Sequence, residues 1–246
     1  MSAAGFVTAY LLHSRSYQDD RLLLDLLVQG QGRQRAVARR PGKKQQGRAR
    51  WPEFTPLTLQ LVGHGELKQV RAIEETQLAL PLQGTYLFAA MYLNELICRV
   101  FPSDSHSENL FDSYQQSLAQ LGAAQLEQAG QSQLEWVLRQ FEFALLQDLG
   151  VPLDPYYDRD GQPIEAATCY RYEQGFVASL QGWLGRDILS LSDAAWPTET
   201  RRLAKQLCRQ LLAPWVGTKP LQSRQLFLAT SSNQSAAAAV EQKESS

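Results

Sequence analysis

The residues best suited to chemistry are cationic and lie close together near the N-terminus. Residues 30–50 contain no Asp or Glu, although the whole chain has a formal net charge of −1. Polyanions respond to the local field, so such a cluster favours binding of a phosphate backbone. The eight cations of this segment, which we call the basic stretch, are Arg33, Arg35, Arg39, Arg40, Lys43, Lys44, Arg48 and Arg50.

The basic stretch divides into a strand and a loop. Arg33, Arg35 and Arg39 share one parity and therefore point to the same side of an extended strand. Pro41-Gly42 ends that strand, and the remaining cations follow on a Gly/Gln/Lys loop. These charges would either track a phosphate backbone or serve only solubility. We favour the first interpretation because clustered like charges repel one another without a partner.

Three aromatic residues lie near these cations. Tyr17, Trp51 and Phe54 could stack on bases, as in proteins that bind single strands, provided that their rings are exposed. Such residues more often belong to the core or anchor a loop, so both interpretations stay open.

A second cationic group follows the helical spacing. Between residues 199 and 212, Leu203, Leu207 and Leu211 form one face of a predicted helix, and the cations lie outside it. This second basic surface is a solvated helix face, a dock for an acidic peptide or a second DNA contact. It consists of Arg201, Arg202, Lys205 and Arg209.

No arrangement of residues indicates catalysis. The sequence contains no phosphate-binding Gly-x-x-x-x-Gly-Lys-Ser/Thr loop and no Gly-x-Ser-x-Gly elbow. The carboxylate pairs Asp19–Asp20 and Asp158/Asp160 are better explained as turn residues. No histidine has a second ligand at metal-binding spacing. We therefore expect no enzyme, no metal and no cofactor, although distant residues could still assemble a nuclease or phosphotransferase site.

The cysteines and the apolar segments bear on location. Cys98, Cys169 and Cys208 are far apart and form no Cys-x-x-Cys pair, which predicts free thiols. No apolar run approaches the roughly 18 residues of a membrane span. The first residues lack the pattern of a secretory signal. We expect a cytoplasmic protein without a membrane partner.

The elements that would position these residues change at about residue 80. Before it, five strands are expected at 5–13, 22–28, 33–39, 54–62 and 67–76, which fits a small antiparallel barrel or sandwich. After it, helices are expected at 85–101, 108–121, 133–149 and 199–212, with a hairpin at 168–172 and 175–179 and a short helix at 223–230. The predicted fold class is α+β. We expect domains at 1–80 and 81–230, with a hairpin region at about 152–184 and a disordered tail at 231–246.

Several short motifs, in this order and spacing, resemble a known family. They include Leu-His-Ser-Arg at 12–15, Gly-Arg-Gln-Arg-Ala-Val-Ala-Arg at 32–39 and Tyr-Leu-Asn-Glu-Leu at 92–96. Thr-Cys-Tyr-Arg-Tyr at 168–172 and Gly-x-Lys-Pro-Leu-x-Ser-Arg-x-Leu-Phe at 217–227 complete the set. The chain resembles the bacterial recombination mediator proteins of the RecO family over nearly its whole length.

The resemblance implies an N-terminal five-stranded OB-fold β-barrel followed by an α-helical C-terminal domain. It implies a non-enzymatic DNA repair and recombination mediator of the RecF pathway, associated with the nucleoid. Such a protein binds single- and double-stranded DNA, anneals complementary strands and assists recombinase loading onto strands coated by single-stranded DNA-binding protein. Its implied partners are the C-terminal tail of that coating protein and RecR. The alternative is an OB-fold structural protein that binds RNA or the ribosome.

Two further expectations follow from the resemblance. Arg139 matches a basic position that the family uses for the tail of the coating protein, and Trp136 and Phe143 flank it on the same helix face. Many family members carry a four-cysteine zinc module, of which this chain retains only Cys169. We therefore expect no zinc, and a hairpin held instead by packing of Tyr156, Tyr157, Tyr170, Tyr172 and Phe176.

Overall fold

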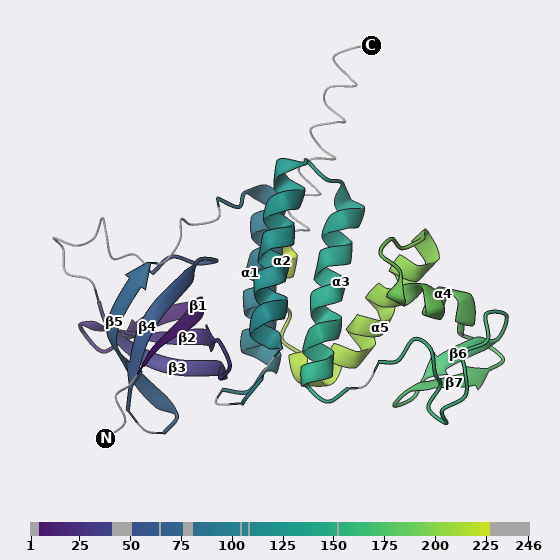
Figure 1. Ribbon diagram of the computed structural model, residues 1–246, viewed down its shortest axis with the longest axis horizontal. Helices are drawn as coiled ribbons and strands as arrows, with labels where there is room; N and C mark the ends of the chain where they lie inside the picture. The colour runs from purple at the N-terminus through teal and green to yellow at the C-terminus, as the bar shows by residue number, and fades with distance from the viewer. Residues whose placement is uncertain are drawn as a thin grey trace, which may run out of the picture. The chain divides into compact units, whose positions relative to one another are not determined.

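The structure is a computed structural model that describes residues 5–40, 51–63, 65–75, 81–103, 105–107, 109–151 and 153–226. The chain forms two compact units (Figure 1). Unit 1 comprises the residues up to Gln128 and those from Thr218 onward, and unit 2 comprises Ala129–Gly217. Unit 2 is therefore inserted in sequence between two parts of unit 1.

Unit 1 begins with a closed five-stranded barrel. Its strands are β1 (Phe6–Tyr17), β2 (Arg21–Val28), β3 (Gly32–Arg39), β4 (Pro56–Val62) and β5 (Leu67–Glu75). They follow the order β1-β2-β3-β5-β4, and β4 pairs with β1 to close the barrel. Among the strand pairs of the described barrel, β3 and β5 are parallel and the others are antiparallel. This topology confirms the expected five-stranded OB-fold barrel.

Side chains of one parity from each strand fill the barrel. Leu24, Leu26 and Ala36 belong to this buried core, with Leu57 and Leu59 from β4. Alternation of inward and outward side chains is what the period of two in a strand produces. Gly32, at the start of β3, has φ +73°, and a Cβ there would come within 2.1 Å of the carbonyl oxygen of Ser105. Only glycine permits this close approach.

Two helices cover part of the outside of the barrel. These are α1 (Gly84–Val100) and α2 (Leu110–Leu126). The Tyr10 ring of β1 packs against Phe111 and Tyr114 of α2, with ring centroids 5.3 and 5.0 Å apart. Asn94 of α1 is buried and donates a hydrogen bond to the carbonyl of Leu12 (3.0 Å). The outward side of β1 is therefore partly core and partly surface.

A C-terminal strap, residues 218–226, returns to α1. The Glu95 carboxylate accepts hydrogen bonds from the backbone N–H groups of Gln222 (2.9 Å) and Ser223 (2.8 Å). Glu95 also forms an i,i+4 ion pair with Arg99 at 3.4 Å, and Arg99 donates to the carbonyl of Lys219 (2.8 Å). Burial raises the pKa of Glu95, but the hydrogen bonds from Ser223 and Gln222 and the charge of Arg99 bring it below its ordinary value.

Unit 2 packs a small sheet and short helices against two long helices. It contains α3 (Gln131–Asp148), β6 (Cys169–Tyr172), β7 (Phe176–Ser179), β8 (Trp183–Leu184), α4 (Gly185–Leu189), the 3-10 helix Ser190–Ser192 and α5 (Thr198–Val216). Its core includes Ile164, Phe176, Ile188 and Leu203. β6 pairs with both β7 and β8, so the predicted hairpin is confirmed and gains a third strand.

The predicted α+β class is confirmed; the structure adds β8, α4 and the 3-10 helix, which were not predicted, and other differences lie at element ends. β1 runs on to Tyr17, because residues 13–17 continue to pair with β2 after a bulge between Leu11 and His13. α5 extends to Val216 although Pro214 lies within it, since a proline in the last turn interrupts little of the helix. The domain boundary at 80 and 81 stays a prediction, and the tail at 231–246 lies outside the described residues.

Candidate nucleic-acid interface

The outward side of β1, β2 and β3 gathers several cations. Cross-strand partners lie on the same side of a sheet. One row of partners across the strands joins Tyr17, Arg21 and Arg39. Side chains of the opposite parity on β2 and β3 belong to the barrel core. Among the residues that the pairing register places on this side, we call six the outer face: His13, Arg15, Tyr17, Arg21, Arg35 and Arg39. Asp25 and the buried Leu23 and Val37 lie on the same side.

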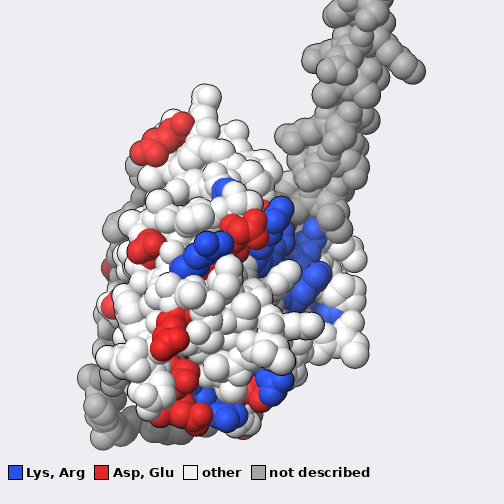
Figure 2. All heavy atoms as spheres, turned by 90° about the vertical axis from the view of Figure 1, so that its right-hand side faces the viewer, with Lys and Arg blue, Asp and Glu red and all other residues white. Residues whose placement is uncertain are grey.

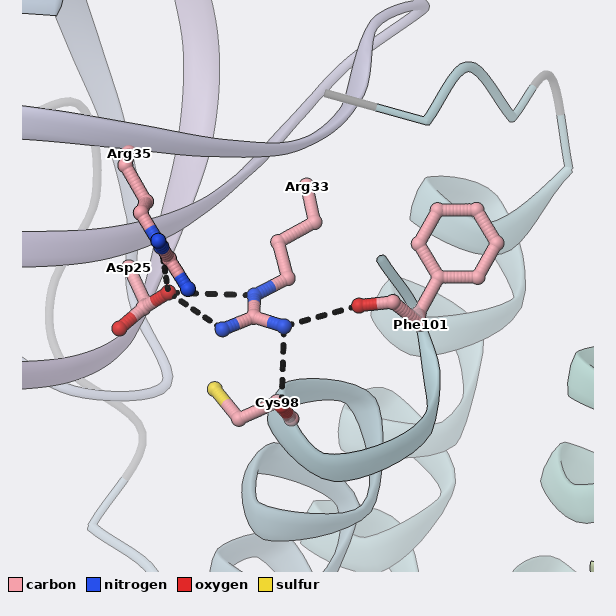
Figure 3. Close-up of polar contacts among 5 residues, drawn as sticks. All are labelled: Asp25, Arg33, Arg35, Cys98 and Phe101. Atoms are coloured by element: carbon pink, nitrogen blue, oxygen red, sulfur yellow. Dashed lines mark hydrogen bonds and ion pairs between the residues drawn. The ribbon is translucent and has the colours of Figure 1, made fainter. Parts of the chain in front are cut away.

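Arg33 shares this parity but is buried. Its guanidinium donates to the Asp25 carboxylate (2.6 and 3.1 Å) and to the carbonyls of Cys98 and Phe101 (both 2.8 Å), as Figure 3 shows. Those carbonyls lie at the C-terminal end of α1, where a positive charge is favourable. The expectation that Arg33 lies beside Arg35 and Arg39 on an exposed surface is wrong, because α1 covers its end of β3.

Arg35 lies two residues further along β3 and remains accessible. Its side chain is 43% exposed, and its Nε lies 3.8 Å from the same Asp25 oxygen that Arg33 binds (Figure 3). Of the two ion pairs of Asp25, the one with Arg33 is therefore the shorter and the more buried. The guanidinium of Arg35 is held loosely and is available to an anion from solution.

Arg39 and Arg40 lie at the end of β3, beside the β1–β2 turn. The Arg39 side chain is 87% exposed, and its Nε lies 3.5 Å from the Asp20 carboxylate, which also lies 4.0 Å from Arg21. Arg40 donates to the hydroxyl of Ser16 (2.8 Å). Exposed ion pairs of this kind contribute at most about 1 kcal/mol, so a phosphate can replace the carboxylate.

The rest of the predicted site falls into two groups. Lys43, Lys44, Arg48 and Arg50 lie outside the described residues. Arg15 and Arg21, by contrast, belong to the outer face but were not predicted. The prediction rested on cations that are close together along the chain, and these two lie outside that cluster. The hairpin turn at Gln18–Asp20, with its Asp pair, was the available signal, because it brings Arg15 and Arg21 into register.

The aromatic candidates are in different surroundings. Trp51 is half-buried and packs against the barrel core, and Phe54 is buried with φ +59°. Both therefore have the structural role that was the alternative to stacking. Tyr17 alone of the three is an exposed ring.

The predicted tail-binding residues lie together on α3 of unit 2. Trp136 and Phe143 both pack against Trp196, with ring centroids 6.4 and 6.1 Å apart. The Arg139 side chain is only 13% exposed and binds the buried carboxylate of Glu142 at 2.7 Å. The sequence analysis missed Glu142, although its i+3 spacing from Arg139 on an apolar stripe signals such a pair.

The second basic surface lies on the solvent side of α5, as predicted, with Leu203 and Leu207 buried. Two of its cations have acidic neighbours: Arg202 binds Glu199 at 2.8 Å, and Lys205 lies 3.6 Å from Glu135 of α3. In the view of Figure 2, some Lys and Arg side chains lie beside Asp or Glu side chains, and others gather without an acidic neighbour. The charge of this surface is therefore partly balanced.

The remaining polar clusters have structural explanations. The Asp158 carboxylate accepts the backbone N–H groups of Asp160 (3.0 Å) and Gln162 (2.7 Å), which confirms its role as a turn residue. The hairpin is held by Tyr170, Tyr172 and Phe176, all of which are buried. The packing role expected for Tyr156 and Tyr157 is wrong, because both side chains are about half exposed. Ile164 fills the core beside them.

The cysteines are free thiols, as predicted. Burial raises the pKa of Cys98 to about 12 and raises that of Cys208 well above its ordinary value, so neither is a reactive thiolate. In the part of the chain that the structure describes, no group of three or more His, Cys, Asp or Glu residues could hold a metal ion. Within the same residues, no helix is long and apolar enough to span a membrane.

A closed barrel of this strand order, followed by helices and carrying a cationic outer face, defines the class of OB-fold proteins with an appended helical domain. Comparison with known families agrees. The family model described as Recombination protein O N terminal matches residues 6–78, and Recombination protein O C terminal matches residues 82–225.

The chain belongs to the RecO family of DNA repair proteins. It is 38% identical over 232 residues to the DNA repair protein RecO of Yersinia enterocolitica, covering 91% of this chain and 94% of that protein. The RecO proteins of Yersinia pestis and Yersinia pseudotuberculosis are similar to the same extent. The resemblance stated from short motifs is thereby confirmed.

Proposed function

We propose that this protein is a non-enzymatic mediator of DNA repair that holds strand backbones on its outer face. In this function it binds single- and double-stranded DNA, anneals complementary strands and assists recombinase loading onto strands coated by single-stranded DNA-binding protein. The observation that carries the proposal is the register of β1–β3, which lines up four arginines on one side: Arg15, Arg21, Arg35 and Arg39. The cations predicted on the following loop would extend this surface.

The physical basis is exchange of weak internal ion pairs for phosphates. Asp20 and Asp25 hold Arg39 and Arg35 at 3.5 and 3.8 Å, which are loose contacts at exposed side chains. Each phosphate contact releases counterions, so affinity gained in this way is independent of base sequence. Neutralisation of two phosphate chains on one surface also lowers the repulsion that opposes annealing.

The salt dependence of binding tests this proposal. For single strands, log affinity should fall linearly with log salt concentration, with a slope of about −0.7 for each phosphate contact. A variant in which Arg35, Arg39, Lys43 and Lys44 are changed to Gln should have a flatter slope. The matched control is Arg171→Gln with Arg186→Gln, two exposed cations of unit 2, which should leave the slope unchanged. Equal slopes for all three proteins would overturn the proposal.

Single-stranded RNA separates this function from its alternative. A mediator of DNA repair should bind DNA at least as tightly as RNA in direct competition and should anneal complementary DNA. Strong preference for RNA, without annealing of DNA, would instead indicate the structural RNA-binding function.

We also propose protein partners for unit 2, namely the tail of the coating protein at Arg139, Trp136 and Phe143, with RecR as a further partner. Partial balance of charge at the second basic surface favours a peptide over DNA there. If so, changing Arg202 and Arg209 to Gln should weaken tail-peptide binding and leave the salt slope for naked DNA unchanged. A flatter slope would assign this surface to DNA.

A further inference from the structure

One aromatic ring on the outer face, that of Tyr17, is partly open to solvent. Tyr17 is 37% exposed at the end of β1. Its ring makes no aromatic contact, and its hydroxyl makes no hydrogen bond, with the residues that the structure describes. More than a third of the Tyr17 surface is therefore open to a ligand from solution, and a tyrosine is also a common residue in strands.

Cations surround this ring on the same side of the sheet. Tyr17 pairs directly with Arg21, which in turn pairs with Arg39. Side chains of such direct partners have Cβ atoms about 5 Å apart. Arg15 lies two residues earlier on β1 and points to the same side. A polyanion neutralised by these arginines would therefore pass within reach of the phenol ring.

Of the ligands that carry a phosphate backbone, only an unpaired strand offers base faces to an aromatic ring. In a duplex those faces are covered by neighbouring bases. We propose that Tyr17 stacks on a base of single-stranded DNA whose phosphates lie against Arg15, Arg21 and Arg39. This inference rests on the proposed function of the outer face and adds to it a residue that distinguishes single strands from duplexes.

Stacking and phosphate contact differ in their dependence on salt. Counterion release sets the slope of log affinity against log salt, whereas stacking on an aromatic ring contributes about 1–3 kcal/mol per base without releasing counterions. Removal of the ring should therefore weaken binding of single strands at every salt concentration by a constant factor. Binding of duplexes should change little.

The test crosses a protein variant with an altered ligand. Tyr17→Leu should bind a single-stranded oligonucleotide at least fivefold more weakly, with an unchanged salt slope, while duplex affinity stays within about twofold. Tyr17→Phe keeps a stacking ring and should retain wild-type affinity. An oligonucleotide of abasic sites keeps the phosphates but has no bases, so wild type and Tyr17→Leu should bind it equally. The matched control is Tyr157→Leu, an exposed tyrosine of unit 2.

The outcomes separate this inference from the proposed function. If wild type binds single strands with a steep salt slope but Tyr17→Leu binds equally well, the stacking role is wrong and the outer face still stands. If Tyr17→Leu weakens single strands, duplexes and abasic strands alike, the ring supports the fold of the face and stacking is again wrong. If wild type shows no salt-dependent binding at all, the proposed function fails.

Discussion

Arg33 and Arg35 lie two positions apart on the same side of one strand, yet they have different structural roles. Arg33 is buried against the end of α1 and makes four hydrogen bonds within unit 1. Arg35 is partly exposed, and its Nε lies 3.8 Å from the Asp25 oxygen that Arg33 binds. Arg33 therefore positions Asp25 and joins the barrel to α1. The guanidinium of Arg35 remains accessible to solvent.

The two residues should separate stability from DNA binding. Arg33→Met leaves Asp25 and two carbonyls without their donor, so it should lower the free energy of unfolding by about 3 kcal/mol. Arg35→Met removes one exposed ion pair and should lower it by less than about 1 kcal/mol. Urea denaturation measures both values. The salt slope for DNA should fall only in Arg35→Met, and similar destabilisation by both variants would contradict the assigned roles.

At the scale of elements, the C-terminal strap depends on one carboxylate of α1. Glu95 accepts two backbone N–H groups and the hydroxyl of Ser223, and it binds Arg99. Ser223 is buried and Leu221 lies beside it in the core. The ionised Glu95 side chain thus helps to hold the strap on α1, together with Arg99, which donates to the carbonyl of Lys219, and Arg224, which donates to the hydroxyl of Tyr92.

This arrangement predicts a stability that depends on pH. Because the folded-state pKa of Glu95 lies below its ordinary value of about 4.3, the stabilisation is complete above that value and is lost as pH falls through the folded pKa. Glu95→Gln should therefore lower the free energy of unfolding by about 1–3 kcal/mol at pH 7. The difference from wild type should shrink below about pH 4.

Urea denaturation between pH 7 and pH 3 measures this difference. Glu66→Gln, which removes an exposed carboxylate of the same unit, serves as the control and should be close to wild type throughout. A deficit of Glu95→Gln that stays constant over this range would show that the side chain acts through its shape and not its charge.

The elements themselves were predictable because they depend on local patterns. The apolar run at residues 22–28 and the shared parity of Arg33, Arg35 and Arg39 predicted strands, and these arginines do lie on one side of β3. Which outward residues are covered was not predictable. The carbonyl partners of Arg33 lie more than 60 residues away along the chain. Every residue has a backbone carbonyl, so the sequence does not show which carbonyl will accept this hydrogen bond.

The same limit applies to the candidate sites. The sequence analysis found Arg139 by resemblance, but the burial of Glu142 depends on how α3 and α5 pack, which no local pattern specifies. Tyr17 and Arg21 joined the outer face only through the register of the β1–β2 hairpin. Charge density along the chain is therefore a guide to the kind of ligand more than to the residues that contact it.

At the scale of the whole molecule, a net charge of −1 gives no general attraction to DNA. On the proposed function, binding of naked strands would come from local cations on the outer face, and recognition of coated strands would come from a protein contact. The two proposed contacts lie in different units, because the outer face belongs to unit 1 and Arg139 belongs to unit 2. The two activities should therefore be separable by mutation.

Arg139→Ala alone is a poor probe, since it would leave the buried Glu142 carboxylate without its cation at a cost of about 3–5 kcal/mol. Changing Arg139 and Glu142 together to Gln removes both charges and keeps polar groups that can hydrogen-bond each other. This double variant should anneal naked complementary oligonucleotides within about twofold of wild type. It should anneal strands coated by single-stranded DNA-binding protein at least tenfold more slowly, because a tail carboxylate loses its charged partner.

The outer-face variant Arg35→Gln with Arg39→Gln should behave differently in the same annealing assay. Loss of phosphate contacts should slow annealing of naked and coated strands alike, and the defect relative to wild type should shrink as salt concentration rises, because the variant has the flatter salt slope. Thermal melting of both variants verifies that each unit is folded. If the α3 variant slows naked annealing as much as coated annealing, unit 2 contributes to DNA binding itself, and the division of tasks between the two units is wrong.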